Sequence, residues 1–242
     1  MFIQNRLGMT EGTETMLAHE RRMDQIANNL ANVDTAGYKK EGVTFWEMMF
    51  TAADRRPRVG KALKLLTDQQ QGSAKQTGNT LDFAINGDGF FKIQTPAGVR
   101  YSRNGNFTLN SQGQLSTFDG NLVMGDGGPI TLTDQNIQVG RDGQISANGV
   151  PISRLELVSF PDLKGLEKEG ANLFRPKAGT AQEQPVGTPN IQQGYLEGTN
   201  VNVVSEMTEM IDLQRAYQSQ QKAIQTTDDI DQQSTSRVGK LT

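Results

Sequence analysis

Apolar residues recur at intervals of seven near the beginning of the chain. Met9, Met16, Met23 and Leu30 form this column. A period of seven gives a helix one narrow apolar seam, and the stretch contains no strong helix breaker after Gly12, so the pattern predicts a helix over about residues 5–33. The adjoining column is polar or small, and a helix lying on the surface of a globular core would show the same pattern.

A second column with the same period lies near the end of the chain, and it is more apolar. Its members are Val203, Met210, Tyr217 and Ile224. Asn202 is a suitable N-cap, so the sequence predicts a helix that begins directly after it. Long isolated helices are only marginally stable in water, and each of the two seams therefore needs a partner. We expect the two terminal helices to pair as a coiled coil, with each other or with further molecules.

The middle of the chain has the alternation and turn chemistry of short strands. Leu81, Phe83 and Ile85 alternate with other residues, and turn signals such as Asn104-Gly105 and Asp142-Gly143 follow at short intervals. Such spacing predicts an antiparallel sheet or barrel. Residues 36–80 are punctuated by glycine and polar runs, and they are expected to be an extended linker.

Together these patterns predict an α+β protein in which a mostly antiparallel β middle lies between two long terminal helices. The expected organisation is an N-terminal core helix (1–35), an extended linker region (36–80), a β-rich outer domain (81–190), and a C-terminal linker with a core helix (191–242).

Composition and charge remove several classes of function. The net charge of −3 leaves no basic surplus for nucleic acid, and the lack of cysteine excludes disulfides and thiolate ligands. The N-terminus shows no secretory signal pattern, and no run of 18 apolar residues is present. The single histidine, His19, lies in the first predicted helix, away from any nucleophile motif. We therefore expect no enzyme activity, no cofactor, no metal site and no small-molecule substrate.

A signature at the end of the first predicted helix gives the chain a family resemblance. It runs through Asn28, Asn29, Leu30, Ala31, Asn32, Gly37 and Tyr38. This segment resembles the motif shared by flagellar basal-body rod and hook proteins. Four further segments resemble motifs of that family in the same order, at residues 81–91, 101–107, 193–201 and 209–217. From the residues alone, the asparagine run is a helix C-terminus.

The resemblance implies a structural subunit of the rod that polymerises through its ends into a hollow axial shaft. In that family the terminal helices line the tube, and the subunits leave the cell through the flagellar type III export apparatus without loss of a signal peptide. The expected location is therefore the basal body and its periplasm-spanning rod. The assembly seam would consist of Met9, Met16, Met23, Leu30, Val203, Met210, Tyr217 and Ile224.

Three questions stay open at this level. The chain most resembles the proximal rod subunit, with the distal rod subunit as the alternative; a wall-modifying enzyme of the flagellum and a coiled-coil adaptor or chaperone are further alternatives. Phe45 and Met49 resemble the element that export substrates present to the export gate. A helical turn packed on the core would explain the same two residues.

Overall fold

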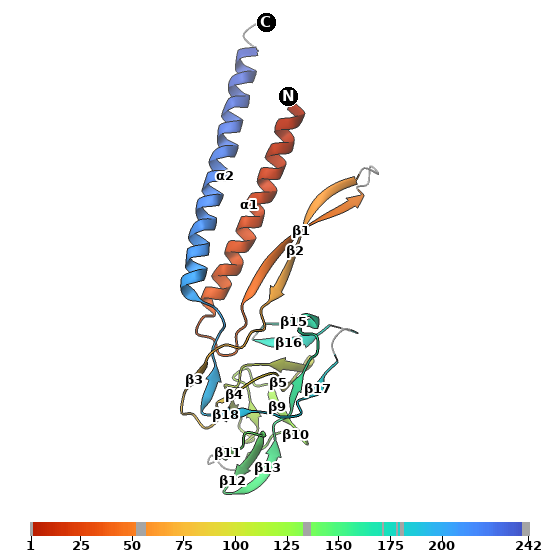
Figure 1. Ribbon diagram of the computed structural model, residues 1–242, viewed down its shortest axis with the longest axis vertical. Coiled ribbons are helices and arrows are strands. Elements are labelled where there is room, and N and C mark those ends of the chain that lie inside the picture. The colour runs from red at the N-terminus through yellow and green to blue at the C-terminus, as the bar shows by residue number, and fades with distance from the viewer. Residues whose placement is uncertain are drawn as a thin grey trace. The chain divides into compact units, whose positions relative to one another are not determined.

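The computed structural model describes residues 2–51, 57–132, 137–170, 172–177, 179 and 182–238. Side chains are described for these residues except 2–11, 45–51, 57–63, 231 and 234–238. The chain divides into two compact units, and Figure 1 traces both. Unit 1 comprises residues 1–31, 41–66 and 202–242, whereas unit 2 comprises residues 32–40 and 67–201.

The elements follow one another along the chain in the order α1(Phe2–Ala31), β1(Glu41–Thr51), β2(Pro57–Thr67), β3(Ala74–Gln76), β4(Phe83–Ile85), β5(Phe90–Thr95), β6(Gly98–Ser102), β7(Thr108–Leu109), β8(Leu115–Ser116), β9(Leu122–Gly125), β10(Gly128–Pro129), β11(Ile137–Val139), β12(Gln144–Ala147), β13(Val150–Arg154), β14(Leu157–Ser159), η1(Leu163–Gly165), β15(Leu166–Lys168), β16(Leu173–Pro176), β17(Gln184–Pro185), β18(Ile191–Gln193), β19(Tyr195–Glu197) and α2(Val203–Val238). The predicted α+β class, with two terminal helices and mostly antiparallel strands, is confirmed.

Unit 1 is built on the two terminal helices, which lie side by side and antiparallel (Figure 1). The beginning of α1 lies near the second half of α2, since a Cβ added to Gly12 would lie 3.3 Å from Cδ1 of Ile224. The predicted cap of α2 is confirmed: the Asn202 side-chain oxygen accepts a hydrogen bond from the Ser205 backbone nitrogen at 3.1 Å. Strand β1 contacts α1 and pairs with β2 in a two-stranded sheet.

The expectation of an extended linker over residues 36–80 is wrong for most of that segment. Strands β1 and β2 are each 11 residues long and pair with each other, and β3 pairs with β19. The glycines and charged residues of this segment interrupt the alternation of apolar and polar residues that would indicate a strand. The backbone hydrogen-bonding groups of β1 pair with those of the neighbouring strand β2. The helical turn considered for Phe45 and Met49 is also wrong, because both residues belong to β1.

Unit 2 is an antiparallel β structure around two apolar clusters. Its largest sheet has the order β15-β16-β6-β5-β9-β8-β7, with β10 attached to β9, β14 attached to β5, and β17 attached to β14. Smaller sheets are β11-β12-β13, β18-β4 and β19-β3. The larger cluster includes Phe83, Phe91 and Phe107, and the smaller one includes Phe90 and Phe174. Edge-to-face rings, such as Phe91 and Phe107 at 5.2 Å between centroids, fix the packing of the core.

Residues from the two ends of unit 2 meet in the same sheets. Strand β18 pairs with β4 through Ile191 and Ile85, both of which are buried. Strand β19 pairs with β3 through Glu197 and Ala74. Residues 32–40 also belong to this unit. The compact β-rich unit therefore extends beyond the residues 81–190 that the sequence analysis assigned to it.

Candidate assembly site

The seam residues predicted on the two helices are half-buried wherever their side chains are described. This holds for Met16, Met23, Leu30, Val203, Met210, Tyr217 and Ile224, whereas the side chain of Met9 lies outside the described residues. Among the described side chains of the pair, the most buried apolar ones are Ile26 and Leu213, which are 3% and 7% exposed. Leu213 lies three residues after Met210, as in a heptad whose two columns alternate by three and four. Sequence reasoning missed this second column because it also contains Glu206 and Gln220.

Asn29 of the family signature joins three elements of unit 1. Its amide nitrogen donates to the carbonyl oxygen of Glu41 at 2.9 Å and to the Glu206 carboxylate at 3.1 Å, while its oxygen accepts from the Glu41 backbone nitrogen at 3.1 Å. Asn29 and Glu206 are each 1% exposed. The side chain thus holds α1 against the start of β1 and the first turn of α2. Asn32 lies directly after the end of α1, where its backbone carbonyl oxygen accepts a hydrogen bond from the Thr35 backbone nitrogen at 3.1 Å.

Gly37 and Tyr38, the last two signature residues, are buried in unit 2. Gly37 has a φ of +67°, and an added Cβ would lie 2.6 Å from the carbonyl carbon of Arg103 and closer still to the nitrogen of Asn104. Only glycine fits this conformation and this space. The Lys168 ammonium lies 3.7 Å from the centroid of the Tyr38 ring. The signature therefore continues from the helix of unit 1 into the interior of unit 2.

A buried cluster of charges lies beside these residues in unit 2. The Glu197 carboxylate accepts from Lys39 at 2.5 Å, from the Gly72 backbone nitrogen at 3.2 Å and from Arg103 at 3.3 Å. The side chains of Lys39 and Glu197 are 1% exposed and that of Arg103 is 6% exposed. Burial lowers the pKa of Lys39 and the pKa of Arg103, and the neighbouring Glu197 carboxylate opposes both shifts.

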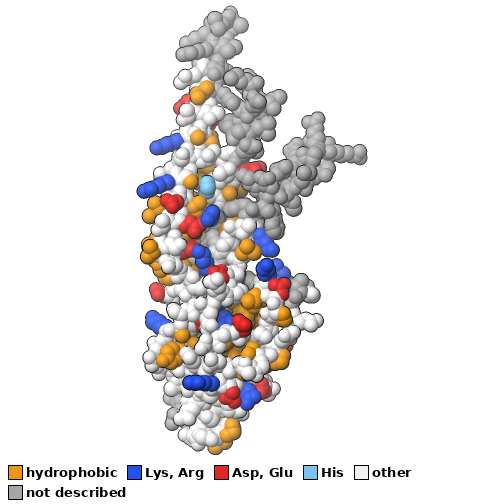
Figure 2. Space-filling view, viewed as in Figure 1, with side chains coloured by type: hydrophobic (Ala, Val, Ile, Leu, Met, Phe, Trp, Pro, Cys, Tyr) orange, Lys and Arg blue, Asp and Glu red, His pale blue; other side chains and the backbone are white. Residues whose placement is uncertain are grey.

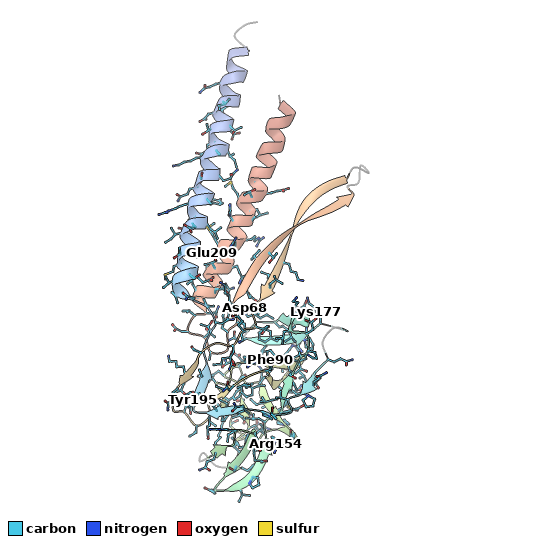
Figure 3. All side chains as sticks on the ribbon, viewed as in Figure 1. Asp68, Phe90, Arg154, Lys177, Tyr195 and Glu209 are labelled. Carbon is cyan, nitrogen blue, oxygen red and sulfur yellow. The ribbon has the colours of Figure 1, made fainter. Side chains whose placement is uncertain are left out.

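The surroundings of the cluster satisfy most of its remaining donors. Lys39 donates to the carbonyl oxygen of Gln70 at 2.7 Å, and Arg103 donates to that of Gly87 at 2.8 Å. The Arg103 guanidinium also lies 5.1 Å from the centroid of the Phe90 ring, and Figure 3 labels Phe90 within the β-rich unit. No periodic pattern in the sequence marks these charges as buried, so sequence reasoning missed them.

An apolar stripe on α2 is exposed. Val204, Met207 and Ile211 follow one another at helical spacing and are 74%, 53% and 49% exposed. Space-filling Figure 2 shows apolar side chains along the helical part of the molecule among polar and charged ones. On the polar side of the pair, Arg22 forms an ion pair with Glu209, a residue that Figure 3 labels on α2. An exposed pair of this kind contributes little to stability.

Within the described residues, no group of three or more histidine, aspartate or glutamate side chains could hold a metal ion. His19 is half-exposed on α1. Over its described length, neither terminal helix has a segment apolar enough to cross a bilayer. The side chains of Phe45 and Met49 lie outside the described residues.

Comparison with known proteins accounts for these motifs. Three family models match the chain: "Flagella basal body rod protein" over residues 11–39, "Flagellar hook protein FlgE/F/G D1 domain" over 84–147, and "Flagellar basal body rod FlgEFG protein C-terminal" over 192–237. The flagellar basal-body rod protein FlgF of Caulobacter vibrioides is 36% identical, and the match covers 95% of this chain and 97% of the relative. The chain belongs to the flagellar basal-body rod protein family.

Two further relatives in this family carry the other rod name. FlgG of Bacillus subtilis is 38% identical, with 90% of this chain and 94% of the relative covered. FlgG of Borreliella burgdorferi is 34% identical, with 89% and 92% covered. The chain is accordingly a structural rod subunit of the flagellum, and its homologues are structural proteins of the rod. Each of the three matched segments contributes one residue to the buried cluster, namely Lys39, Arg103 and Glu197.

Proposed function

We propose that this rod-family subunit polymerises through its paired terminal helices, with other rod subunits as partners. The observation that carries the proposal is the exposed stripe of Val204, Met207 and Ile211 on a helix that also packs against α1. A helix that packs on one side and remains apolar on another has a second surface to bury. Contacts made by different faces of one subunit generate open helical assemblies, as a shaft requires.

The helix pair itself is the framework of this surface, and we propose that it is a coiled coil. Val203, Met210, Tyr217 and Ile224 supply one heptad column of α2, and Leu213 belongs to the alternating column. Met16, Met23 and Leu30 supply the facing column of α1, to which Met9 would add a further member. On this proposal the seam residues hold the subunit together, and the outer stripe joins it to its neighbours.

We propose the proximal position in the rod, with the distal position as the alternative. The match covers slightly more of the Caulobacter FlgF than of the Bacillus FlgG, at 97% against 94%. Residues 124–130 and 150–157 also resemble the pattern of the proximal subunit. They form the β9–β10 hairpin and the β13 strand with its continuation.

Export is the remaining part of the proposal. We propose that the chain reaches the periplasm-spanning rod through the flagellar type III apparatus without cleavage of a signal peptide, and that Phe45 and Met49 are the element read by the export gate. Replacing Phe45 by alanine would then reduce secretion into the medium while the purified protein keeps its melting temperature. Normal secretion with a lowered melting temperature would instead favour a packing role for Phe45.

The assembly surface is tested with a matched pair of charge substitutions on α2. Met207→Asp introduces a carboxylate into the stripe, whereas Ser219→Asp introduces the same charge at an exposed polar position on another face of the same helix. We expect Met207→Asp to abolish co-assembly with a distal rod subunit, measured by sedimentation and electron microscopy, with an unchanged helical melting curve. Assembly by Met207→Asp at the level of Ser219→Asp would contradict the proposal.

A further inference from the structure

Lys39, Arg103 and Glu197, the members of the buried cluster, lie outside the strands of the large sheet. Lys39 is in the segment between α1 and β1, Gly72 follows β2, and Glu197 ends β19 shortly before α2. The chain passes between the units after residues 31, 40, 66 and 201. The contacts of Glu197 therefore join, within unit 2, the segments that lead to β1, from β2 and to α2.

The cluster has one carboxylate for two cations. Among the described residues, the ion pairs of Lys39 and of Arg103 both end on Glu197. If Glu197 were absent, two buried cations would remain near each other without their shared counter-ion. Removing one partner of a buried ion pair is far more costly than replacing the whole pair by apolar groups. The cluster therefore penalises any fold in which residue 197 is missing or displaced.

The pairing of β19 with β3 is short, and backbone hydrogen bonds extend it on both sides, from Gly194, which accepts from Thr77, to Gly198, which donates to Ser73. Strand β19 pairs with β3 over only three residues, Ala74, Lys75 and Gln76, all of which are exposed. The backbone oxygen of Glu197 also accepts from the Gly37 nitrogen at 2.7 Å, which links the same residue to the signature.

We propose that the Lys39–Glu197–Arg103 cluster is a closure latch, which orders the connecting segments only when the C-terminal part of the chain has docked. Two of the three residues lie 158 positions apart in the sequence. The latch therefore closes late in folding, because a contact of such long range costs loop-closure entropy before it is rewarded. Until it closes, Lys39 and Arg103 remain hydrated and the segments around them remain mobile.

The latch is tested in the full-length chain by a double-mutant cycle. Glu197→Gln keeps the shape of the side chain but removes the anion, and Lys39→Met removes one cation while an Arg103–Glu197 pair remains. We expect Glu197→Gln to lower the melting temperature of the β-rich unit by roughly 10 °C. We also expect faster amide hydrogen exchange at residues 37–40 and 70–76 than in β5 and β6. Glu167→Gln is the matched control, because Glu167 pairs with Arg175 on the surface.

The distinguishing result is rescue. Adding Lys39→Met to Glu197→Gln should raise the melting temperature above that of Glu197→Gln alone, because the second substitution removes a buried cation without a partner. If Glu197→Gln does not fold at all, recovery of folded protein in the double variant gives the same support. Additive losses, failure of the double variant while Lys39→Met folds, or a response of Glu197→Gln equal to that of Glu167→Gln would overturn the latch.

Discussion

Asn29 is a buried amide whose three hydrogen bonds hold α1, β1 and α2 together. We predict that Asn29→Ala lowers the free energy of unfolding of the helix pair by about 2–4 kcal/mol, because it leaves the Glu206 carboxylate and two backbone groups of Glu41 without this partner. Thermal unfolding followed by circular dichroism at the helical band measures the loss. Gln214→Ala removes an exposed amide from α2 and should change stability by less than about 0.5 kcal/mol. Equal effects of the two substitutions would contradict the role of Asn29.

Gly37 and Gly78 distinguish two ways in which replacing a glycine can destabilise the protein, namely backbone strain and steric overlap. Both have positive φ, at +67° and +75°, but an added Cβ would collide with the backbone of residues 103 and 104 at Gly37 and would meet nothing within 4 Å at Gly78. We predict a loss of about 1–2 kcal/mol for Gly78→Ala from backbone strain alone. For Gly37→Ala we predict a loss greater by at least about 2 kcal/mol, since the surrounding backbone must also shift. Urea denaturation of the two variants measures the difference, and similar midpoints would show that the space at Gly37 adapts.

We expect the stability of unit 2 to decrease at alkaline pH because of Tyr101. Burial and the hydrogen bond to Glu183 raise the pKa of Tyr101 above its usual value of 10, while the same hydrogen bond lowers the pKa of Glu183 below 4.5. The unfolded chain ionises this tyrosine above about pH 10, whereas the folded chain keeps it neutral, so stability falls as pH rises from there. We predict that wild type loses more melting temperature between pH 9 and pH 11 than Tyr101→Phe does. Parallel curves would mean that Tyr101 titrates equally in both states.

At the scale of elements, the terminal helices could be predicted from the sequence and the β1–β2 hairpin could not. The period of seven at Val203, Met210, Tyr217 and Ile224 is a local signal, and the Asn202 cap gives the start of α2. Strands β1 and β2 satisfy their backbone groups on each other, and no local pattern records such a pairing. The buried cluster could not be predicted for the same reason. The charged residues at 39, 103 and 197 become buried only when three segments that are distant in the sequence come together.

Leu213 and Val204 test which face of α2 holds the helix pair. Leu213 is 7% exposed against α1, whereas Val204 is 74% exposed. We predict that Leu213→Ala destabilises the helix pair by about 2–3 kcal/mol through lost burial and a residual cavity. Val204→Ala should leave the melting curve within about 0.5 kcal/mol of wild type, since alanine also favours the helix. Melting curves of the isolated subunit, followed at the helical band, measure both losses. A larger loss of stability for Val204→Ala than for Leu213→Ala would show that α2 packs on α1 through the Val204 face instead.

At the scale of the whole molecule, both compact units are built from distant parts of the chain. Unit 1 takes residues from both ends and from 41–66, and unit 2 joins residues 32–40 to 67–201. The N-terminal part of the chain, up to the end of β1, contacts the rest of the chain in several ways. They include the packing of α1 on α2, the pairing of β1 with β2, the hydrogen bond between Asn29 and Glu206, and the ion pair between Lys39 and Glu197. A break in the chain between β1 and β2 would therefore leave two fragments, each of which contributes residues to both units.

This arrangement predicts the behaviour of a chain that is cut once. A specific protease site inserted between β1 and β2 should give two fragments that elute together from a sizing column in native buffer, because the contacts that join them bury apolar and charged groups in both units. The fragments should separate in denaturing urea, which removes those contacts. Combining the cut with Asn29→Ala and Glu197→Gln should release the N-terminal fragment in native buffer, whereas the cut combined with Gln214→Ala and Glu167→Gln should not. Separation of the unsubstituted fragments in native buffer would show that covalent continuity, and not these contacts, holds the N-terminal segment in place.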